Sequence, residues 1–245
     1  MLAEYLSSDY PIAGFWRRIF AFIVDSVILG SIGWAAGLIF FDAFVQLGPW
    51  GRLLGFCVAL VYFGVQNSKI AGGQTFGKRL LKIRVVGKNG APLSVQMAFV
   101  RFLPLGAPWF LNNAQFPPSL LFTYWIYPLS VAIFGIGLSI VYLYVFNRKT
   151  RQSLHDLLVG SYVVSGESKE PVEAAPLWKL HSAVCVFILA GSCVVPYFTS
   201  NLATTETFAP MINVGRAVSA APWVAHAQVQ MHPITHMLRC NIVSD

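Results

Sequence analysis

The chain has 245 residues, of which 56% are hydrophobic and only 11% are charged, and its formal net charge is +7. Soluble domains carry about 25% charged residues, so this composition excludes an ordinary soluble domain. It indicates a membrane protein whose main partner is the lipid bilayer. The excess of cations does not indicate binding to nucleic acid, because no aromatic-rich soluble platform accompanies them.

Two apolar runs in the first part of the chain are long enough to be membrane spans. Residues 19–41 contain a single charge, Asp25, and about 20 helical residues are needed to cross the hydrocarbon core. Residues 50–67 form a shorter run with Arg52 at its start, where a long side chain can reach the lipid headgroups. Both runs are predicted to span.

The residues before the first span are expected to lie in the cytoplasm. A short segment, residues 1–12, is followed by Arg17 and Arg18, which suit the cytoplasmic end of a span. The apolar run after these arginines is too long for a signal peptide and lacks a small-residue cleavage site, so we expect the first span to remain as an anchor.

The loop after the second span, "AGGQTFGKRLLKIRVVGKNG", comes close to a phosphate-binding loop. Gly72, Gly77 and Lys78 have the required spacing, but Arg79 stands where a Ser or Thr should bind magnesium. We therefore expect no nucleotide and no other cofactor. Instead, the loop's cations predict a cytoplasmic location, and a tight turn at the membrane surface is predicted at its glycines, Gly72, Gly73 and Gly77.

A small cytoplasmic sheet is predicted next to this loop. The segment "LLKIRVVGKNGAPLS" has the pattern of a strand, a turn at Asn89 and Gly90, and a return segment. A second β-prone piece, "GSYVVS" at residues 160–165, is predicted to pair with it beneath the membrane.

Charge placement requires one more crossing. The cationic regions around residues 69–88 and 148–179 both belong on the cytoplasmic side, yet only one long apolar run, residues 119–146, lies between them. The candidate for the missing crossing is residues 98–111, which contain Arg101 and the prolines Pro104 and Pro108. We expect this segment to be short and broken by its prolines, too polar to face lipid alone, and therefore a packed or partly re-entrant crossing.

The uncharged run at residues 119–146 is itself expected to kink, because it contains Pro128, Gly135 and Gly137. The predicted fold is all-α and transmembrane, with about five membrane segments and a small cytoplasmic sheet. Its membrane domain is expected to cover residues 13–165.

The rest of the chain is predicted to be a polar linker at residues 166–179, a further span at residues 180–198 and an extracytoplasmic tail at residues 199–245. The tail holds soft metal donors, and its weak candidates for Cu(I) or Zn(II) ligands are His232, His236 and Cys240. Pro233 interrupts the helix that would align the two histidines, and the spacing fits no closed metal site. We therefore predict a loosely ordered tail without a bound metal.

Asp25 is the acidic side chain that burial in a span makes expensive. An ionised carboxylate at the centre of the bilayer costs roughly 2.5–3.5 kcal/mol, so Asp25 is either protonated or paired. Arg101 is the expected partner, either in a structural pair or beside a carboxylate that binds an ion or proton. Arg18 is expected to stay at the headgroups as a topology anchor.

Asp156 has two interpretations. Ser153 and Asp156 form the S-x-x-D pattern of a capping box at the start of a short helix, and capping alone explains the acid. The alternative is an ion pair with Arg17, Arg18 or Lys78 that ties the cytoplasmic loops to the first span. The neighbouring His155 is expected to be solvated.

Three segments together resemble a known family. "AGFWRRIFAFIVDSVIL", "GGQTFGKRLLKIRVV" and "RQSLHDLLVGSYVV", in this order, are similar to the RDD family of bacterial membrane proteins over about residues 13–164. The residues that match its naming pattern are Arg18, with Arg17 adjacent, Asp25 and Asp156. The resemblance implies a multi-pass protein of the inner membrane, with transport of ions or small ligands as the suspected role and no defined substrate.

No catalytic constellation is found, since neither G-x-S-x-G nor H-E-x-x-H occurs, and we expect no enzyme. Two hypotheses remain. The first is a small transporter with Asp25 as its intramembrane carboxylate, which with five segments is expected to work as a homodimer. The second is a membrane scaffold or accessory subunit whose polar residues only hold helices and loops together.

Overall fold

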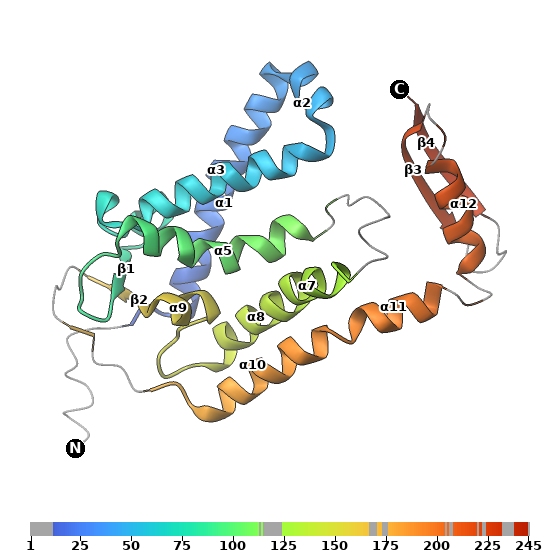
Figure 1. Ribbon diagram of the computed structural model, residues 1–245. Coiled ribbons are helices and arrows are strands. Elements are labelled where there is room, and N and C mark those ends of the chain that lie inside the picture. Colours follow the sequence, from blue (N-terminus) through green and yellow to red (C-terminus); the bar gives the residue numbers. More distant parts are fainter. Residues whose placement is uncertain are drawn as a thin grey trace. The chain divides into compact units, whose positions relative to one another are not determined.

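The computed structural model describes residues 12–112, 114, 124–166, 171–172, 176–203, 205, 208–219, 221, 224–231 and 238–244. The chain forms two compact units, one ending at Ser192 and one beginning at Cys193, and each is described by itself. The first unit contains the helices and the small sheet that carry the polar residues discussed below (Figure 1).

The first unit begins with a helical hairpin. Helix α1 (Phe15–Ile39) is followed by α2 (Phe41–Leu47), the short 3-10 turn η2 (Gly48–Trp50) and α3 (Gly51–Gln66). The 25 residues of α1 are about 37 Å long, which exceeds the roughly 30 Å of a hydrocarbon core. The first turns of α1 therefore have room to lie at the membrane surface.

Helix α5 (Val95–Leu111) runs antiparallel to α3 along its whole length. At one end the backbone N–H of Lys69 donates to the carbonyl of Leu93 at 2.7 Å, and at the other end Arg52 Nη1 donates to the carbonyl of Asn112 at 2.6 Å. The prediction that prolines break this segment is wrong, because α5 is one continuous helix through Pro104 and Pro108. Prolines are tolerated inside a membrane helix when neighbouring helices pack against it, and α5 packs against α3.

The uncharged run is also helical from Ile126 to Phe146. This part consists of α7 (Ile126–Ser130), the π-helical segment η4 (Val131–Gly135) and α8 (Ile136–Phe146), so a π-helical turn lies within the segment that is expected to kink. Helix α10 (Lys179–Ser192) packs against η4 at Gly135, where an added Cβ would lie 2.7 Å from Ser192 Oγ.

The sheet and three short helices lie at one end of these long helices. The short elements after α3 are η3 (Lys69–Ala71), α4 (Phe76–Leu80) and, later, α9 (Leu154–Val159). The predicted small sheet is present: β1 (Ile83–Gly87) pairs antiparallel with β2 (Ser161–Ser165), with Val85 opposite Val163. The start of α1, the sheet, α9 and the end of α8 gather at this end, which we call the sheet end (Figure 1).

The larger buried apolar cluster of the first unit is at the sheet end, and a smaller one, with Ala59, Phe63 and Phe102, lies between α3 and α5. The buried apolar residues at the sheet end join β1, β2 and the start of α1, and include Ala13, Ala21, Ile83, Val85 and Val163. The backbone N–H of Ala13 donates to the carbonyl of Val163 at 2.8 Å, which fixes the start of α1 to the sheet. This attachment holds the first turns of α1 against protein.

Four helices of the described residues are long and apolar enough to cross a membrane: Phe15–Ile39, Phe41–Gln66, Ile126–Phe146 and Lys179–Phe198. Helix α5 is apolar but shorter. The large side chains on these helices are widely exposed, with Trp34 70% and Ile39 73% exposed, as expected of surfaces that face lipid.

The second unit contains α11 (Val195–Ala203), α12 (Ala209–Ser219) and the antiparallel strands β3 (Val224–Met231) and β4 (Leu238–Ser244). The prediction of a loosely ordered tail is therefore wrong for its described part. The candidate metal ligands His232 and His236 lie outside the described residues, while Cys240 is exposed in β4.

Candidate functional site

Two buried arginines converge on a single carboxylate at the sheet end. Arg18 of α1 approaches Asp156 Oδ2 through Nη2 at 2.5 Å, and Arg101 of α5 approaches Asp156 Oδ1 through Nη2 at 2.6 Å. Asp156 lies on α9, so this triad joins three elements that are far apart in the sequence. Its members are buried, with Asp156 entirely enclosed.

The electrostatics of the triad favour an ionised carboxylate. Burial by itself would raise the pKa of Asp156, but the charges of Arg101 and Arg18, together with the hydrogen bond from Arg101, outweigh it and hold the pKa well below its ordinary value. A buried charge of this kind is tolerated only while its partners are present. The triad is therefore a single structural unit.

Further hydrogen bonds fix the orientation of each arginine. Arg101 Nε donates to Ser161 Oγ at 3.1 Å, and Arg18 Nη1 donates to the carbonyl of Arg151. The Arg18 guanidinium also lies over the ring of Tyr144, 4.7 Å from its centroid. The two guanidinium groups thus have partners on α8, β2 and the loop before α9.

The structure corrects two expectations about these residues. Arg18 does not extend to the headgroups but is buried against Asp156. Asp156 accepts a hydrogen bond from the Ser153 N–H at 3.3 Å, as in the predicted capping box, yet it also pairs with Arg18, as in the alternative. Arg17 is exposed and lies 3.4 Å from Ser165 Oγ, outside the triad.

Asp25 occupies a second buried site and has three hydrogen-bond donors. Tyr62 Oη donates to Oδ1 at 2.7 Å, Thr75 Oγ1 donates to Oδ2 at 2.5 Å, and the Gly77 N–H donates to Oδ1 at 2.8 Å. The expected Asp25–Arg101 pair is absent, since Arg101 is directed to Asp156. Among the described residues, no cationic side chain lies within 4 Å of Asp25.

These donors explain the loop that resembles a phosphate-binding loop. Thr75 is the N-cap of α4, and its hydroxyl accepts from the Lys78 N–H at 3.3 Å while it donates to Asp25. A helix N-terminus favours negative charge, and here the protein's own carboxylate supplies it. The loop therefore binds an internal acid of α1.

Glycine is needed at these loop positions for different physical reasons. Gly72 and Gly73 have positive φ values of 66° and 76°, which agrees with the predicted turn. Gly77 instead allows close packing, because a Cβ there would overlap the carbonyl oxygen of Ala21 in α1. Only a glycine lets α4 approach α1 closely enough for the Gly77 N–H to reach Asp25.

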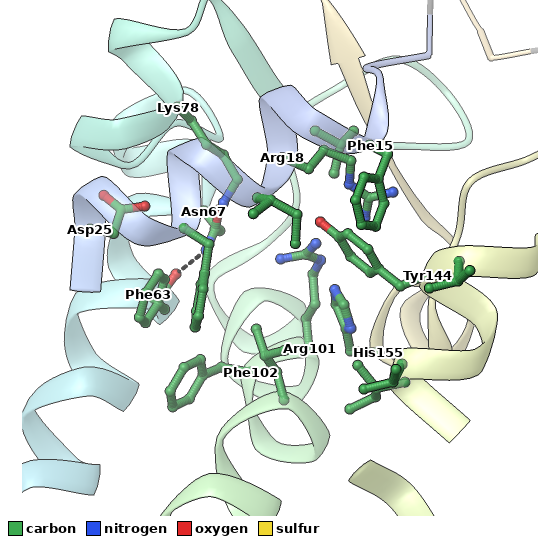
Figure 2. A pocket seen from close by; sticks show the side chains of 17 residues that line it. Phe15, Arg18, Asp25, Phe63, Asn67, Lys78, Arg101, Phe102, Tyr144 and His155 are labelled. Atoms are coloured by element: carbon green, nitrogen blue, oxygen red, sulfur yellow. Dashed lines mark hydrogen bonds between the residues drawn. The ribbon is translucent and has the colours of Figure 1, made fainter. Parts of the chain in front are cut away.

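A cavity of about 330 Å³ separates the two carboxylate sites. Figure 2 shows Asp25, Asn67 and Lys78 on one side of it and Arg101, His155 and Tyr144 on the other. Its charged lining consists of Arg18, Lys78, Arg101 and Asp25, and the remaining wall is largely apolar, with side chains such as Phe22, Phe63, Phe102, Leu105 and Val141.

Lys78 is the lining residue whose charge changes near neutral pH. Its Nζ donates to Asn67 Oδ1 at 2.6 Å. Burial, and then the positive charge of Arg101, lower the pKa of Lys78 to about 7. Its protonation state therefore responds to small changes in pH or to an arriving charge.

His155 is buried and uncharged rather than solvated as expected. Burial lowers the pKa of His155 to about 3, although Asp156 acts in the opposite direction. Its Nδ1 has no hydrogen-bond partner among the described residues. Sequence reasoning also missed Tyr62, Asn67 and Thr75, whose only signal was their polar character at the end of a span and in the loop.

The sites show no sign of a metal centre. No group of three or more His, Cys, Asp or Glu side chains comes together in the part of the chain that the structure describes. The charged groups that line the cavity are mainly cations, which do not bind metal ions.

Comparison with known proteins gives the family. The model of the RDD family matches residues 12–160, a range that contains Arg18, Asp25, Arg101 and Asp156. An uncharacterised protein, YckC, of Bacillus subtilis (strain 168) is 25% identical over 154 residues, which are 63% of this chain and 85% of YckC. No solved structure matches. The chain is a multi-pass membrane protein with apolar helices that imply a bilayer environment, and it belongs to the RDD family.

Proposed function

We propose that this protein is a membrane transporter that binds a small ligand with an anionic group in the cavity between Asp25 and the triad. The observation that supports this most directly is the lining of the cavity, which combines three cations with an apolar wall. Ligand cavities have this character, with few polar groups in a mainly hydrophobic surface.

The charges favour an anionic ligand over a cation. Arg18 and Arg101 share one carboxylate, Asp156, and Lys78 donates to the amide oxygen of Asn67 rather than to an acid. The acid that lines the cavity, Asp25, already accepts three hydrogen bonds. A cation would have to displace these donors, whereas an anion would meet Lys78 directly. The ligand-binding role therefore moves from Asp25 to Lys78.

A second candidate function, a non-enzymatic scaffold or accessory subunit, has its own support. Asp25 and Asp156 each connect several elements, and neither carboxylate is left with an unpaired oxygen. Under this hypothesis the polar residues hold the sheet end together, and the cavity takes up no ligand.

Flux measurements distinguish the two candidates. Purified full chain in liposomes is assayed with octanesulfonate, whose sulfonate stays charged and whose tail suits the apolar wall, and with octyltrimethylammonium as the cation of similar shape. Transport predicts flux of octanesulfonate alone. Lys78→Met should reduce it at least about tenfold, since a charge-assisted hydrogen bond contributes roughly 1.5–3 kcal/mol. Lys88→Met, a change of an exposed lysine outside the cavity, is the matched control.

The flux result distinguishes the transport proposal from the scaffold hypothesis. A folded protein that moves neither probe, or both equally, would contradict the anion-transport proposal and favour the scaffold. Crosslinking in the same liposomes tests the homodimer that a transport path with so few segments would require.

We also propose that the protein lies in the bacterial inner membrane with its sheet end in the cytoplasm. Lys and Arg side chains concentrate in the loops at this end, as the positive-inside rule predicts. The antiparallel contacts of α5 with both ends of α3 support α5 as an additional crossing. Five crossings would then put residues after α10 outside the cytoplasm.

A further inference from the structure

We propose that a second pocket at the sheet end binds the phosphate headgroup of an anionic phospholipid. This pocket has a volume of about 680 Å³ and lies between the start of α1 and the loop after α8. It is lined by Arg17, Arg148 and Arg151, with Arg18 behind them and Trp16 and Tyr144 as aromatic walls. The inference does not depend on the transport proposal.

The three arginines that line the pocket lack acidic partners. Among the described residues, no carboxylate lies within 4 Å of Arg17, Arg148 or Arg151. Arg17 and Arg148 are exposed, and Arg151 is partly exposed. Several guanidinium groups around one concave surface, with no acid paired to them in the described part of the chain, favour a phosphate, because guanidinium groups bind phosphate oxygens in pairs of parallel hydrogen bonds.

The backbone around the pocket is fixed by the buried triad. Arg151 has a positive φ of 51°, which is uncommon for a residue other than glycine. Its carbonyl accepts from Arg18, and its N–H donates to the carbonyl of Asn147 at 3.0 Å. The Arg151 guanidinium lies near Gly14, where an added Cβ would be 3.7 Å from Nη1. The triad thus holds Arg151 in place beside the start of α1.

The position of the pocket indicates a lipid rather than a soluble anion. Trp16, 67% exposed, stands at the first turn of α1, and Arg148 follows Asn147, the residue that caps the end of α8. Tryptophan is enriched at the membrane interface, and arginines next to a span lie at the level of the headgroups. In this proposal the pocket opens at the level of the lipid headgroups, and its aromatic and apolar side faces the acyl chains.

Native mass spectrometry of the full chain in detergent tests this assignment. Phosphatidylglycerol and phosphatidylcholine with the same acyl chains are added separately, and bound lipid is counted. The wild-type protein should retain phosphatidylglycerol at least about tenfold more strongly, and the triple variant Arg17→Gln, Arg148→Gln, Arg151→Gln should lose this preference. The control triple variant Lys69→Gln, Arg79→Gln, Lys88→Gln removes equal charge away from the pocket and should keep it.

Three results would overturn the proposal. A wild-type protein without lipid preference would exclude the site. An equal loss of the phosphatidylglycerol preference in the control variant would show that the lipid is attracted by the overall positive charge rather than bound in the pocket. Displacement of phosphatidylglycerol by millimolar inorganic phosphate would assign the site to a free anion. Thermal unfolding monitors folding of each variant, and if the triple variant unfolds, Arg148→Gln alone should show a partial loss.

Discussion

Asp156 is the residue on which the sheet end depends most. It accepts hydrogen bonds from two buried arginines, from Ser161 Oγ and from the Ser153 N–H, and so joins α1, α5, α9 and β2. Removing one member of a buried ionic group costs more than the group contributed, because the remaining charges stay buried without partners. The arginines alone would leave two uncompensated charges.

Asp156→Asn should therefore be strongly destabilising, by about 3–5 kcal/mol in the free energy of unfolding. The protein should insert poorly or lose its thermal transition in detergent, measured by fluorescence-detected size exclusion after heating. Asp42→Asn, which removes an exposed acid of α2, is the matched control and should have little effect. Equal stability of the two variants would contradict the structural role of the triad.

Lys78 differs from Asp156 because its environment disfavours its own charge. Its pKa is about 7 in the folded protein, lowered first by burial and then by Arg101, and lies near its ordinary value of 10.5 in the unfolded chain. Between these two values the unfolded chain binds more protons than the folded protein. The free energy of unfolding must therefore rise with pH across this range.

We expect the wild-type protein to gain stability between pH 7 and pH 9, on the order of 1 kcal/mol, since the side chain is only partly enclosed. Lys78→Met should remove this gain and be at least as stable as the wild type at pH 7. Unfolding temperatures in detergent at the two pH values measure both effects. A wild-type protein whose stability falls as pH rises, with Lys78→Met unchanged, would disprove the assignment.

At the scale of elements, the main feature is how α4 docks on α1. The five residues of α4 form too short a helix to be stable alone. Thr75 caps it, Asp25 accepts from its N-terminal N–H group and from the Thr75 hydroxyl, and Gly77 provides the close approach to Ala21. The N-cap, the hydrogen bonds and the close packing thus all hold α4 in the same position on α1.

Gly77→Ala should displace α4 from α1, because the new methyl group would overlap a backbone carbonyl that cannot move aside. Overpacking of this kind costs roughly 1–3 kcal/mol, and here the hydrogen bond to Asp25 is lost as well. Gly33→Ala is the control, since nothing lies within 4 Å of a Cβ at Gly33 and alanine favours the helix. Thermal unfolding should separate the two variants, and a neutral Gly77→Ala would contradict this packing.

At the scale of the whole molecule, the path of α5 beside α3 bears on how often the chain crosses the membrane. The end of α3 meets the start of α5, and the start of α3 meets the end of α5. Helix α5 therefore covers the same distance as α3, despite its prolines and Arg101. This geometry supports the proposed crossing by α5, which the placement of the cationic loops predicts.

Single cysteines introduced into a protein without native cysteines test this topology. Cysteines at Lys88 and Lys149 should both react with an impermeant reagent from the cytoplasmic side only, and one at Asp42 from the opposite side only. The expectation follows because α5 and the α7–α8 run return the chain to the sheet end. Labelling of position 149 from the same side as position 42 would remove α5 from the set of crossings.

The sequence by itself determined the class of the protein and its local elements. The apolar runs, the paired strands around Val85 and Val163, the cap at Ser153 and the turn glycines all follow from patterns within a few residues. Composition predicted the membrane environment, and three ordered motifs predicted the family that the family model then confirmed. These inferences hold because hydrophobicity, turn chemistry and capping act over short distances.

Only the tertiary structure decided which charges meet. Asp25 and Arg101 both lie in predicted membrane segments, and the free-energy cost of burying each charge in lipid makes a pair between them reasonable. In the structure, however, Arg101 donates to Asp156, and no sequence pattern predicts that contact. Asp25 instead binds a helix start some fifty residues away in the chain. The strength of a charge interaction depends on distance and burial in three dimensions, and the helix docking that sets both is not encoded in any local segment.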